Sequence, residues 1–186
     1  SDWSSDVCSS DLDSSMRRFT LLLVLLSLMS FVVTAQDESF NLTIIHTNDT
    51  HAAHLPGNNG NGGVAALASV VKQIRGEAPN TLFLDAGDRF TGTLFHTQYQ
   101  GQDQVQIMNL LGYDAMALGN HEFDNGDAVL GDFISGVNFP VLGANIDASQ
   151  SPELNGKILP YTIFDVGGRQ VGVIGLTTAE TAVISN

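Results

Sequence analysis

The sequence predicts an α/β fold in which short strands alternate with helices along the chain. Two observations carry this prediction. Short runs of β-branched and apolar residues recur, and between them apolar residues repeat at the spacing of one helix face. Glycines also follow two of the helical segments, where a left-handed residue commonly ends a helix. Strands and helices that alternate in this way form a sheet covered by helices.

Six runs have the composition of strands. Each is short and largely apolar or β-branched, and each is bounded by turn-forming residues. The expected strands are 40–46, 81–84, 115–118, 139–142, 161–166 and 170–176. The last two flank Gly167 and Gly168, a pair of residues that favours a β-hairpin.

Three segments have the apolar spacing of helices. They are 64–75, 102–111 and 128–134. Gly76 and Gly112 follow the first two segments, so each glycine is expected to end its helix.

The N-terminal segments stand apart from this pattern. Residues 1–15 have no hydrophobic period and resemble the translation of a sequencing adapter; a natural disordered leader is the alternative. Residues 16–35 contain an arginine pair, an apolar run and small residues at the end, which is typical of a secretory signal peptide. A membrane anchor is the alternative, but the apolar run, 21–33, is shorter than the roughly 20 residues of a spanning helix.

Residues 36–186 are expected to form the N-terminal part of one domain. The strand at 170–176 lies so close to the end of the chain that we expect the domain to be truncated. The protein is expected to be exported, to the periplasm or the extracellular space, with surface association and oligomeric state left open. The formal net charge of −13 argues against a nucleic acid polymer or an anionic membrane as a partner. Because the single cysteine is Cys8, residues 36–186 have neither a disulfide nor a thiolate metal site.

Polar clusters follow the first three expected strands. Asp49 and His51 come after the first strand, and residues two apart in extended chain project to the same side. Asp88 comes after the second strand, next to Gly87, which permits a tight turn or a close approach. Asp85 is a rival for this position, but we expect it to serve as an acceptor or a turn cap.

The third cluster is the run G-N-H-E-F-D. Asn120 offers an amide oxygen, His121 can act on a substrate, and Asp124 can accept the other ring N–H of His121 and so fix its tautomer. A helix N-cap Asn with a capping Asp nearby is the alternative. Because ligands gather at the carboxyl ends of strands in open α/β sheets, all three clusters are expected at one edge. Such ligands can hold two divalent metal ions, which activate water toward a phosphorus ester.

The runs N-D-T-H, L-D-A-G-D-R-F-T-G-T and Y-D-A-M-A-L-G-N-H-E-F-D-N-G resemble the N-terminal metallophosphoesterase domain of the secreted 5′-nucleotidase family, within the calcineurin-like phosphoesterases. The resemblance spans 41–186. It implies a calcineurin-like metallophosphoesterase sandwich of mixed β-sheets flanked by helices, C-terminally incomplete. It also implies a small-molecule nucleotide as the substrate, hydrolysed to nucleoside and phosphate.

The resemblance also implies a role for each site residue. Asp49 and His51 would bind one metal ion, Asn120 a second, and Asp88 would bridge both. His121, oriented by Asp124, would stabilise the transition state as the catalytic dyad. The cofactors would be two divalent ions, Zn, Mn or similar.

The family completes its site with a G-H and a G-H-T-H segment, and neither occurs in residues 1–186. We therefore expect the chain alone to be inactive. The alternatives are a 2′,3′-cyclic phosphodiesterase, a UDP-sugar hydrolase, or an inactive metal-binding fragment. Among the other histidines, His46 and His96 are expected to be structural or solvated, while His54 could approach the site.

Overall fold

The computed structural model describes Met16, Phe19, Thr20 and residues 39–185. The expected leader, 1–15, lies outside the described residues, and so does the expected signal peptide, apart from those three positions. The chain divides into two units, Ser1–Phe40 and Asn41–Asn186, and the second contains the sheets. No helix in the described part of the chain is long and apolar enough to cross a membrane.

Four parallel strands form the main sheet of the second unit. Their order in the sheet is their order in the chain: β1 (Thr43–Thr47), β2 (Thr81–Asp85), β3 (Ala115–Ala117) and β4 (Val141–Leu142). A connection between two neighbouring parallel strands is right-handed. Because each strand lies next to the one before it, all three connections pass over the same face of the sheet.

Four helices make these crossovers: α2 (Gly63–Glu77), α3 (Leu94–Tyr99), α4 (Gln102–Leu111) and α5 (Gly126–Gly136). They share one core with the sheet, in which Phe83 and Met116 from the strands meet Met108 and Phe133 from the helices, all four with no exposed area. Each such side chain contributes roughly 1.5–3 kcal/mol by burial. This core fixes the strand ends relative to one another.

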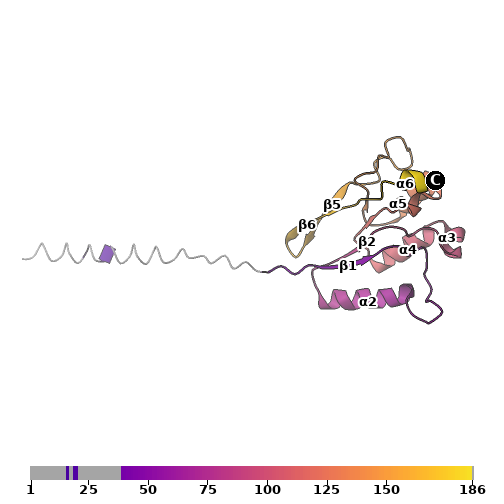
Figure 1. The fold of residues 1–186 in the computed structure, drawn as a ribbon. Coiled ribbons are helices and arrows are strands. Elements are labelled where there is room, and N and C mark those ends of the chain that lie inside the picture. The colour runs from indigo at the N-terminus through magenta and orange to yellow at the C-terminus, as the bar shows by residue number, and fades with distance from the viewer. Residues whose placement is uncertain (1–15, 17–18, 21–38, 186) are drawn as a thin grey trace, which may run out of the picture. The chain divides into compact units, whose positions relative to one another are not determined.

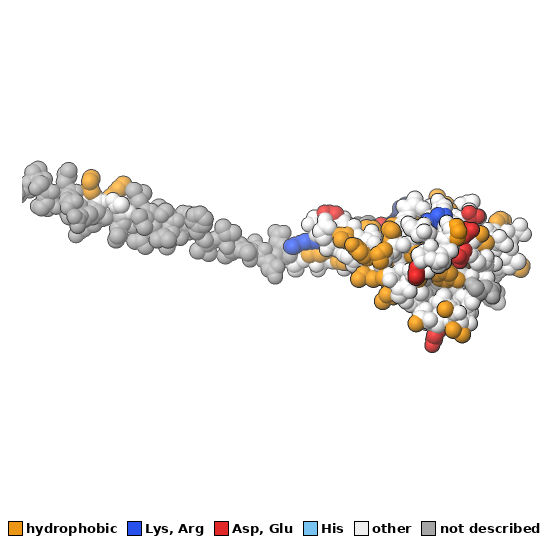
Figure 2. Space-filling model, turned by 90° about the horizontal axis from the view of Figure 1, so that it is seen from above, with side chains coloured by type: hydrophobic (Ala, Val, Ile, Leu, Met, Phe, Trp, Pro, Cys, Tyr) orange, Lys and Arg blue, Asp and Glu red, His pale blue; other side chains and the backbone are white. Residues whose placement is uncertain are grey.

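The antiparallel hairpin of β5 (Tyr161–Val166) and β6 (Arg169–Ile174) is the second sheet. Residues of β6 line a cavity with His46 and Leu84, so the hairpin lies over the face of the main sheet opposite α2 (Figure 1). Large apolar side chains remain exposed on β1, β5 and β6, and Figure 2 shows hydrophobic side chains on the surface of this unit. The chain continues through a short helix, α6 (Thr181–Ile184).

The predicted α/β fold flanked by helices is confirmed; several predicted strands have slightly different bounds in the structure, and three further differences concern the helices. The prediction that Gly76 ends its helix is wrong, because α2 runs to Glu77 and Ala78 is the extended C-cap. A residue before proline is restricted to extended conformations, so Pro79 sets this boundary. Helix α5 begins before the predicted segment, and α3 was not predicted.

Two turn predictions are confirmed. Gly112 ends α4 with a φ of 72°, and its N–H donates back to the helix. Gly167 and Gly168 both have positive φ and join Val166 to Arg169 in a two-residue hairpin turn.

Candidate metal centre

The loops after β1 and β2 are joined by backbone hydrogen bonds. The N–H of Asp49 donates to the carbonyl of Gly87, and that of His51 donates to the carbonyl of Asp88, both at 3.0 Å. A third bond of the same length runs from Ala52 to Arg89. The two loops therefore hold Asp49, His51 and Asp88 side by side at the sheet edge.

The same two loops hold an unusual backbone conformation. Non-glycine residues with positive φ are uncommon, and for a β-branched residue such a φ is an outlier. Five non-glycine residues with positive φ lie in these loops: Asp49, His51, Ala52, Asp88 and Thr91. Strain of this kind costs on the order of 1–3 kcal/mol per residue and clusters at functional sites.

Three predicted site residues come within ligand distance of one another. His51, Asp88 and His121 each place one possible ligand atom within 4.8 Å of the others. The rings of the two histidines meet edge to face, with centroids 5.0 Å apart. Asp49 is more exposed, and its Oδ1 lies 4.0 Å from Nε2 of His51. Asn120 precedes His121 in the third loop and is half-buried.

The hydrogen bond of His51 leaves one ring nitrogen for a metal ion. Its Nδ1 lies 3.1 Å from the carbonyl oxygen of Phe90. A carbonyl only accepts, so Nδ1 carries the proton and Nε2 keeps a lone pair. A histidine ligand whose other N–H is held by a carbonyl is the usual arrangement in metal sites. The donor set of imidazole, carboxylate and amide therefore fits a divalent ion.

His121 and Asp124 form a close pair. Nδ1 of His121 lies 2.6 Å from Oδ2 of Asp124, so the carboxylate fixes the tautomer of the ring. The hydrogen bond to Asp124 is the main cause that raises the pKa of His121, and burial opposes it. The protonated form of the ring is therefore favoured more than in a free imidazole, and in that form the ring can donate a hydrogen bond to an anionic phosphate.

Glu122 ties the second and third loops together, and the sequence analysis gave it no role. Its carboxylate has no exposed area and accepts four backbone N–H groups. Oε2 receives those of Asp88 at 3.0 Å and Gly119 at 2.7 Å, and Oε1 those of Arg89 at 2.7 Å and Phe90 at 3.3 Å. Burial raises the pKa of Glu122, while these N–H groups lower it by favouring the ionised form. Its place inside the G-N-H-E-F-D run was the only signal for it in the sequence.

Two glycines permit the close approach of these loops. A Cβ atom on Gly119 would lie 2.2 Å from Oδ1 of Asp88, and one on Gly87 would lie 2.2 Å from the backbone nitrogen of Gly119. The N–H of His121 donates to Oδ1 of Asp88 at 3.1 Å. The position of the Asp88 carboxylate thus depends on the absence of a side chain at Gly119.

Asp85 is not among the grouped ligands. It accepts the N–H of Gly87 at 3.0 Å and the hydroxyl of Thr47 at 2.5 Å. Burial raises the pKa of Asp85, and the nearby Arg89 guanidinium, at 3.4 Å, lowers it. Asp85 therefore caps the turn and supports the loop from below.

The remaining histidines are used elsewhere. Nε2 of His54 lies 2.6 Å from Asp103, with both side chains buried. His96 is buried, and its Nε2 lies 2.7 Å from Oδ1 of Asn125. His46 is exposed on β1. None of the three belongs to the group formed by His51, Asp88 and His121.

Comparison with known proteins identifies the class to which this fold and site belong. A family model described as calcineurin-like phosphoesterase matches residues 42–182. The chain belongs to the calcineurin-like phosphoesterase family, and the resemblance found in its motifs is confirmed.

Within that family the chain is similar to 5′-nucleotidases. It is 46% identical to the 5′-nucleotidase of Rattus norvegicus over 179 residues, which are 89% of this chain and 31% of the relative. It is 48% identical to the snake venom 5′-nucleotidase of Naja atra over 160 residues, 80% of this chain and 30% of the relative. The crystal structure of the 5′-nucleotidase precursor from Thermus thermophilus has a TM-score of 0.76 and 49% identity, over 79% of this chain and 30% of that one. The chain spans about 30% of the length of these relatives.

Proposed function

We propose that this chain is part of a phosphohydrolase that uses two divalent metal ions to convert nucleoside 5′-monophosphates and water into nucleosides and phosphate. The observation that carries the proposal is the grouping of His51, Asp88 and His121 at the strand ends. The similarity to 5′-nucleotidases supports the choice of substrate.

Two divalent ions, when bound, would supply positive charge that activates water and stabilises the phosphoryl oxygens. Asp49 and His51 would hold one ion, Asn120 the other, and Asp88 both. Zn and Mn both suit this mixture of carboxylate, imidazole and amide groups.

His121 is the residue that we assign to the phosphate itself. Asp124 holds its Nδ1–H, so the protonated ring can donate Nε2–H to a phosphoryl oxygen. The raised pKa of His121 supports this role. In the overall reaction the ester P–O bond breaks, the leaving oxygen gains a proton, and the oxygen of water ends on the phosphate.

We further propose that the protein is exported and that residues 16–35 direct the export. One similar protein is a 5′-nucleotidase precursor and another is a venom enzyme, and both support this localisation.

A second candidate is that residues 1–186 bind metal but do not turn over substrate. Within residues 39–185 only one group of three His or acidic side chains can share an ion, and it contains His121, which the first proposal uses for the phosphate. The 186-residue chain is therefore expected to release little phosphate from AMP.

The test is release of phosphate from AMP, 2′,3′-cyclic AMP and UDP-glucose in the presence of Mn²⁺ or Zn²⁺. The chain of 186 residues and the product of the gene's complete reading frame are compared. We expect AMP to be the preferred substrate of the complete product. A preference for either of the other substrates would select that alternative. Rapid release from AMP by the 186-residue chain would refute the second candidate.

A further inference from the structure

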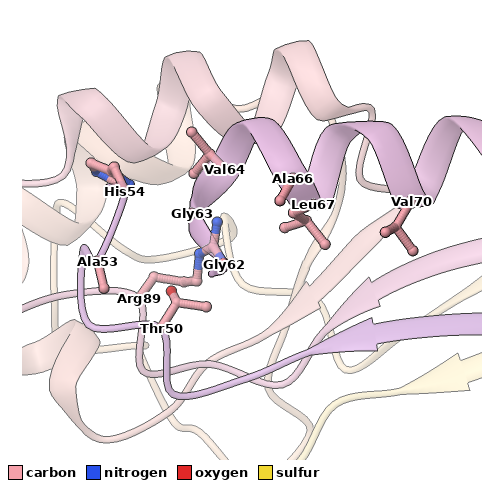
Figure 3. A pocket seen from close by; sticks show the side chains of 10 residues that line it. All are labelled: Thr50, Ala53, His54, Gly62, Gly63, Val64, Ala66, Leu67, Val70 and Arg89. Carbon is pink, nitrogen blue, oxygen red and sulfur yellow. The ribbon is translucent and has the colours of Figure 1, made fainter. Parts of the chain in front are cut away.

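A cavity lies behind the metal-binding loops, under the first turn of α2 (Figure 3). Its volume is about 380 Å³, within the range of small-molecule sites. Thr50, from the loop after β1, and Arg89, from the loop after β2, both line it, but the proposed metal ligands do not. The cavity is thus separate from the candidate metal centre.

Two buried polar atoms at this cavity lack a hydrogen-bond partner among the described residues, Nε of Arg89 and Oγ1 of Thr50. Arg89 is only 2% exposed. Its Nη1 lies 3.4 Å from both Asp85 and the hydroxyl of Tyr113, which leaves the Nε–H unused. Burial of a donor without an acceptor destabilises the folded chain. An acceptor that enters the cavity could pair with this N–H, since no described residue supplies one.

The N-terminus of α2 also favours a negative charge here. Gly62 stands at the N-cap without a side chain to accept an N–H, and the first turn holds no acidic residue. The N–H of Val64 donates to the backbone carbonyl oxygen of His54, and that oxygen carries no formal charge. The partial positive charge of a helix N-terminus attracts anions. In Figure 3 the guanidinium of Arg89 extends toward this same helix start.

Apart from His54, whose Nε2 lies 2.6 Å from Oδ2 of Asp103, the rest of the cavity is lined by apolar side chains and glycines. Leu67 and Val70 point from α2 toward the strands, and Ala53 and Ala66 also line the space (Figure 3). A phosphate ion would turn some of its oxygens toward these apolar side chains and leave them without partners. A carboxylate has two oxygens, one for each unpartnered atom, and can carry an apolar tail. The formal net charge of −13 disfavours anions elsewhere on the chain, so the local groups must provide the selectivity.

We propose that this cavity binds a small organic carboxylate with a short apolar tail. The carboxylate oxygens accept from Arg89 Nε and Thr50 Oγ1 near the start of α2. The tail lies along Leu67 and Val70.

The test is a titration of the purified, metal-free chain with butanoate in EDTA, followed by NMR through the Nε–H signal of Arg89. We expect saturable binding that shifts this signal. Butanamide, which has the same shape without the charge, and inorganic phosphate are each expected to bind about tenfold more weakly or worse. A linear titration, an unmoved Arg89 signal, or equal binding of butanamide or phosphate would overturn the proposal. If butanamide bound as tightly as butanoate, the cavity would accept any neutral hydrogen-bond acceptor, including water.

Two sets of variants locate the site. Thr50→Val keeps the side-chain shape, removes the hydroxyl, and is expected to weaken butanoate binding about tenfold. Val70, which is 51% exposed, allows a matched pair: Val70→Glu should weaken binding about fivefold by repulsion, whereas Val70→Gln should weaken it less. Circular dichroism checks folding, and the Val70 pair decides if Thr50→Val does not fold. Unchanged affinity in the folded variants would refute the site.

Discussion

The buried carboxylate of Glu122 accepts the backbone N–H of Asp88 at 3.0 Å, across 34 positions of sequence. The same carboxylate accepts three further N–H groups, so it holds the loop that carries Asp88 against the loop that carries His121. The candidate metal centre thus depends on a residue that does not face the metal ions.

Replacing Glu122 by Gln should weaken both the fold and metal binding. The amide has one acceptor oxygen instead of two and turns N–H groups toward the N–H groups of the chain. We expect the free energy of unfolding to fall by about 2–3 kcal/mol and the affinity for Mn²⁺ to fall about tenfold or more. Denaturant titration and calorimetry measure the two quantities. Glu180→Gln, at an exposed position, is the control, and equal behaviour of the two variants would contradict the assigned role.

Replacing Gly119 by Ala should displace the Asp88 carboxylate, because the added Cβ would lie 2.2 Å from its Oδ1. We expect Mn²⁺ affinity to fall about tenfold or more, as measured by calorimetry. Metal binding that matches the unchanged chain would show that Asp88 is not a ligand.

Gly76→Ala is the matched control for this change. Gly76 lies within α2, and a Cβ there would meet nothing within 4 Å. Because alanine favours the helix, we expect the free energy of unfolding to rise by about 0.5–1 kcal/mol with no change in metal affinity. A loss of stability in a thermal or denaturant melt would count against the open environment of Gly76.

Replacing His121 by Asn tests whether this residue acts on the substrate or binds metal, since it lies within ligand distance of His51 and Asp88. We expect turnover of AMP by the complete gene product to fall by about 10²–10⁴ while its metal content is kept. Metal content is measured by atomic emission in the same samples. A loss of bound metal in the variant would instead make His121 a ligand.

The pair of His121 and Asp124 should make stability depend on pH in the metal-free chain. The pKa of His121 is raised above its ordinary value of 6.5, chiefly by the hydrogen bond to Asp124, so the folded state holds the proton more tightly than the unfolded state. The stabilisation by the pair should be fully present below about pH 6.5 and should be lost as the pH rises through the folded pKa.

The comparison of the unchanged chain with Asp124→Asn isolates this effect. Denaturant titrations in EDTA from pH 5 to 9 should show a stability difference that is largest at low pH and shrinks as the pH rises. A difference that stays constant or grows with pH would contradict the pairing.

Much of the fold and the identity of the candidate ligands could be predicted from local patterns. Apolar spacing marked α4 with the bounds 102–111 that the structure has, and the Gly167–Gly168 pair marked the hairpin. These features depend on neighbours along the chain, which a sequence displays directly. The placement of polar residues after three successive strands likewise predicted a shared edge, because parallel strands end on the same side of a sheet.

Tertiary structure decided what lies around those ligands. Helix α3 has only six residues, so its apolar spacing is too short to be recognised in the sequence. Its start is capped by a hydrogen bond from the Phe95 N–H to the Thr93 side chain. Glu122 and Arg89 are charged residues, a type that usually lies on the surface. Only the folded structure shows that each is buried and bonded to partners from other segments.

The sequence by itself therefore determined the class of protein and indicated the chemical groups of its candidate site. The tertiary structure determined how those groups are held: Glu122 joins two loops, Asp85 caps a turn, and the rings of His51 and His121 meet with centroids 5.0 Å apart. The physical reason is that a buried charged group must be hydrogen-bonded or paired. The packing of the core brings it next to partners that are far away in the sequence.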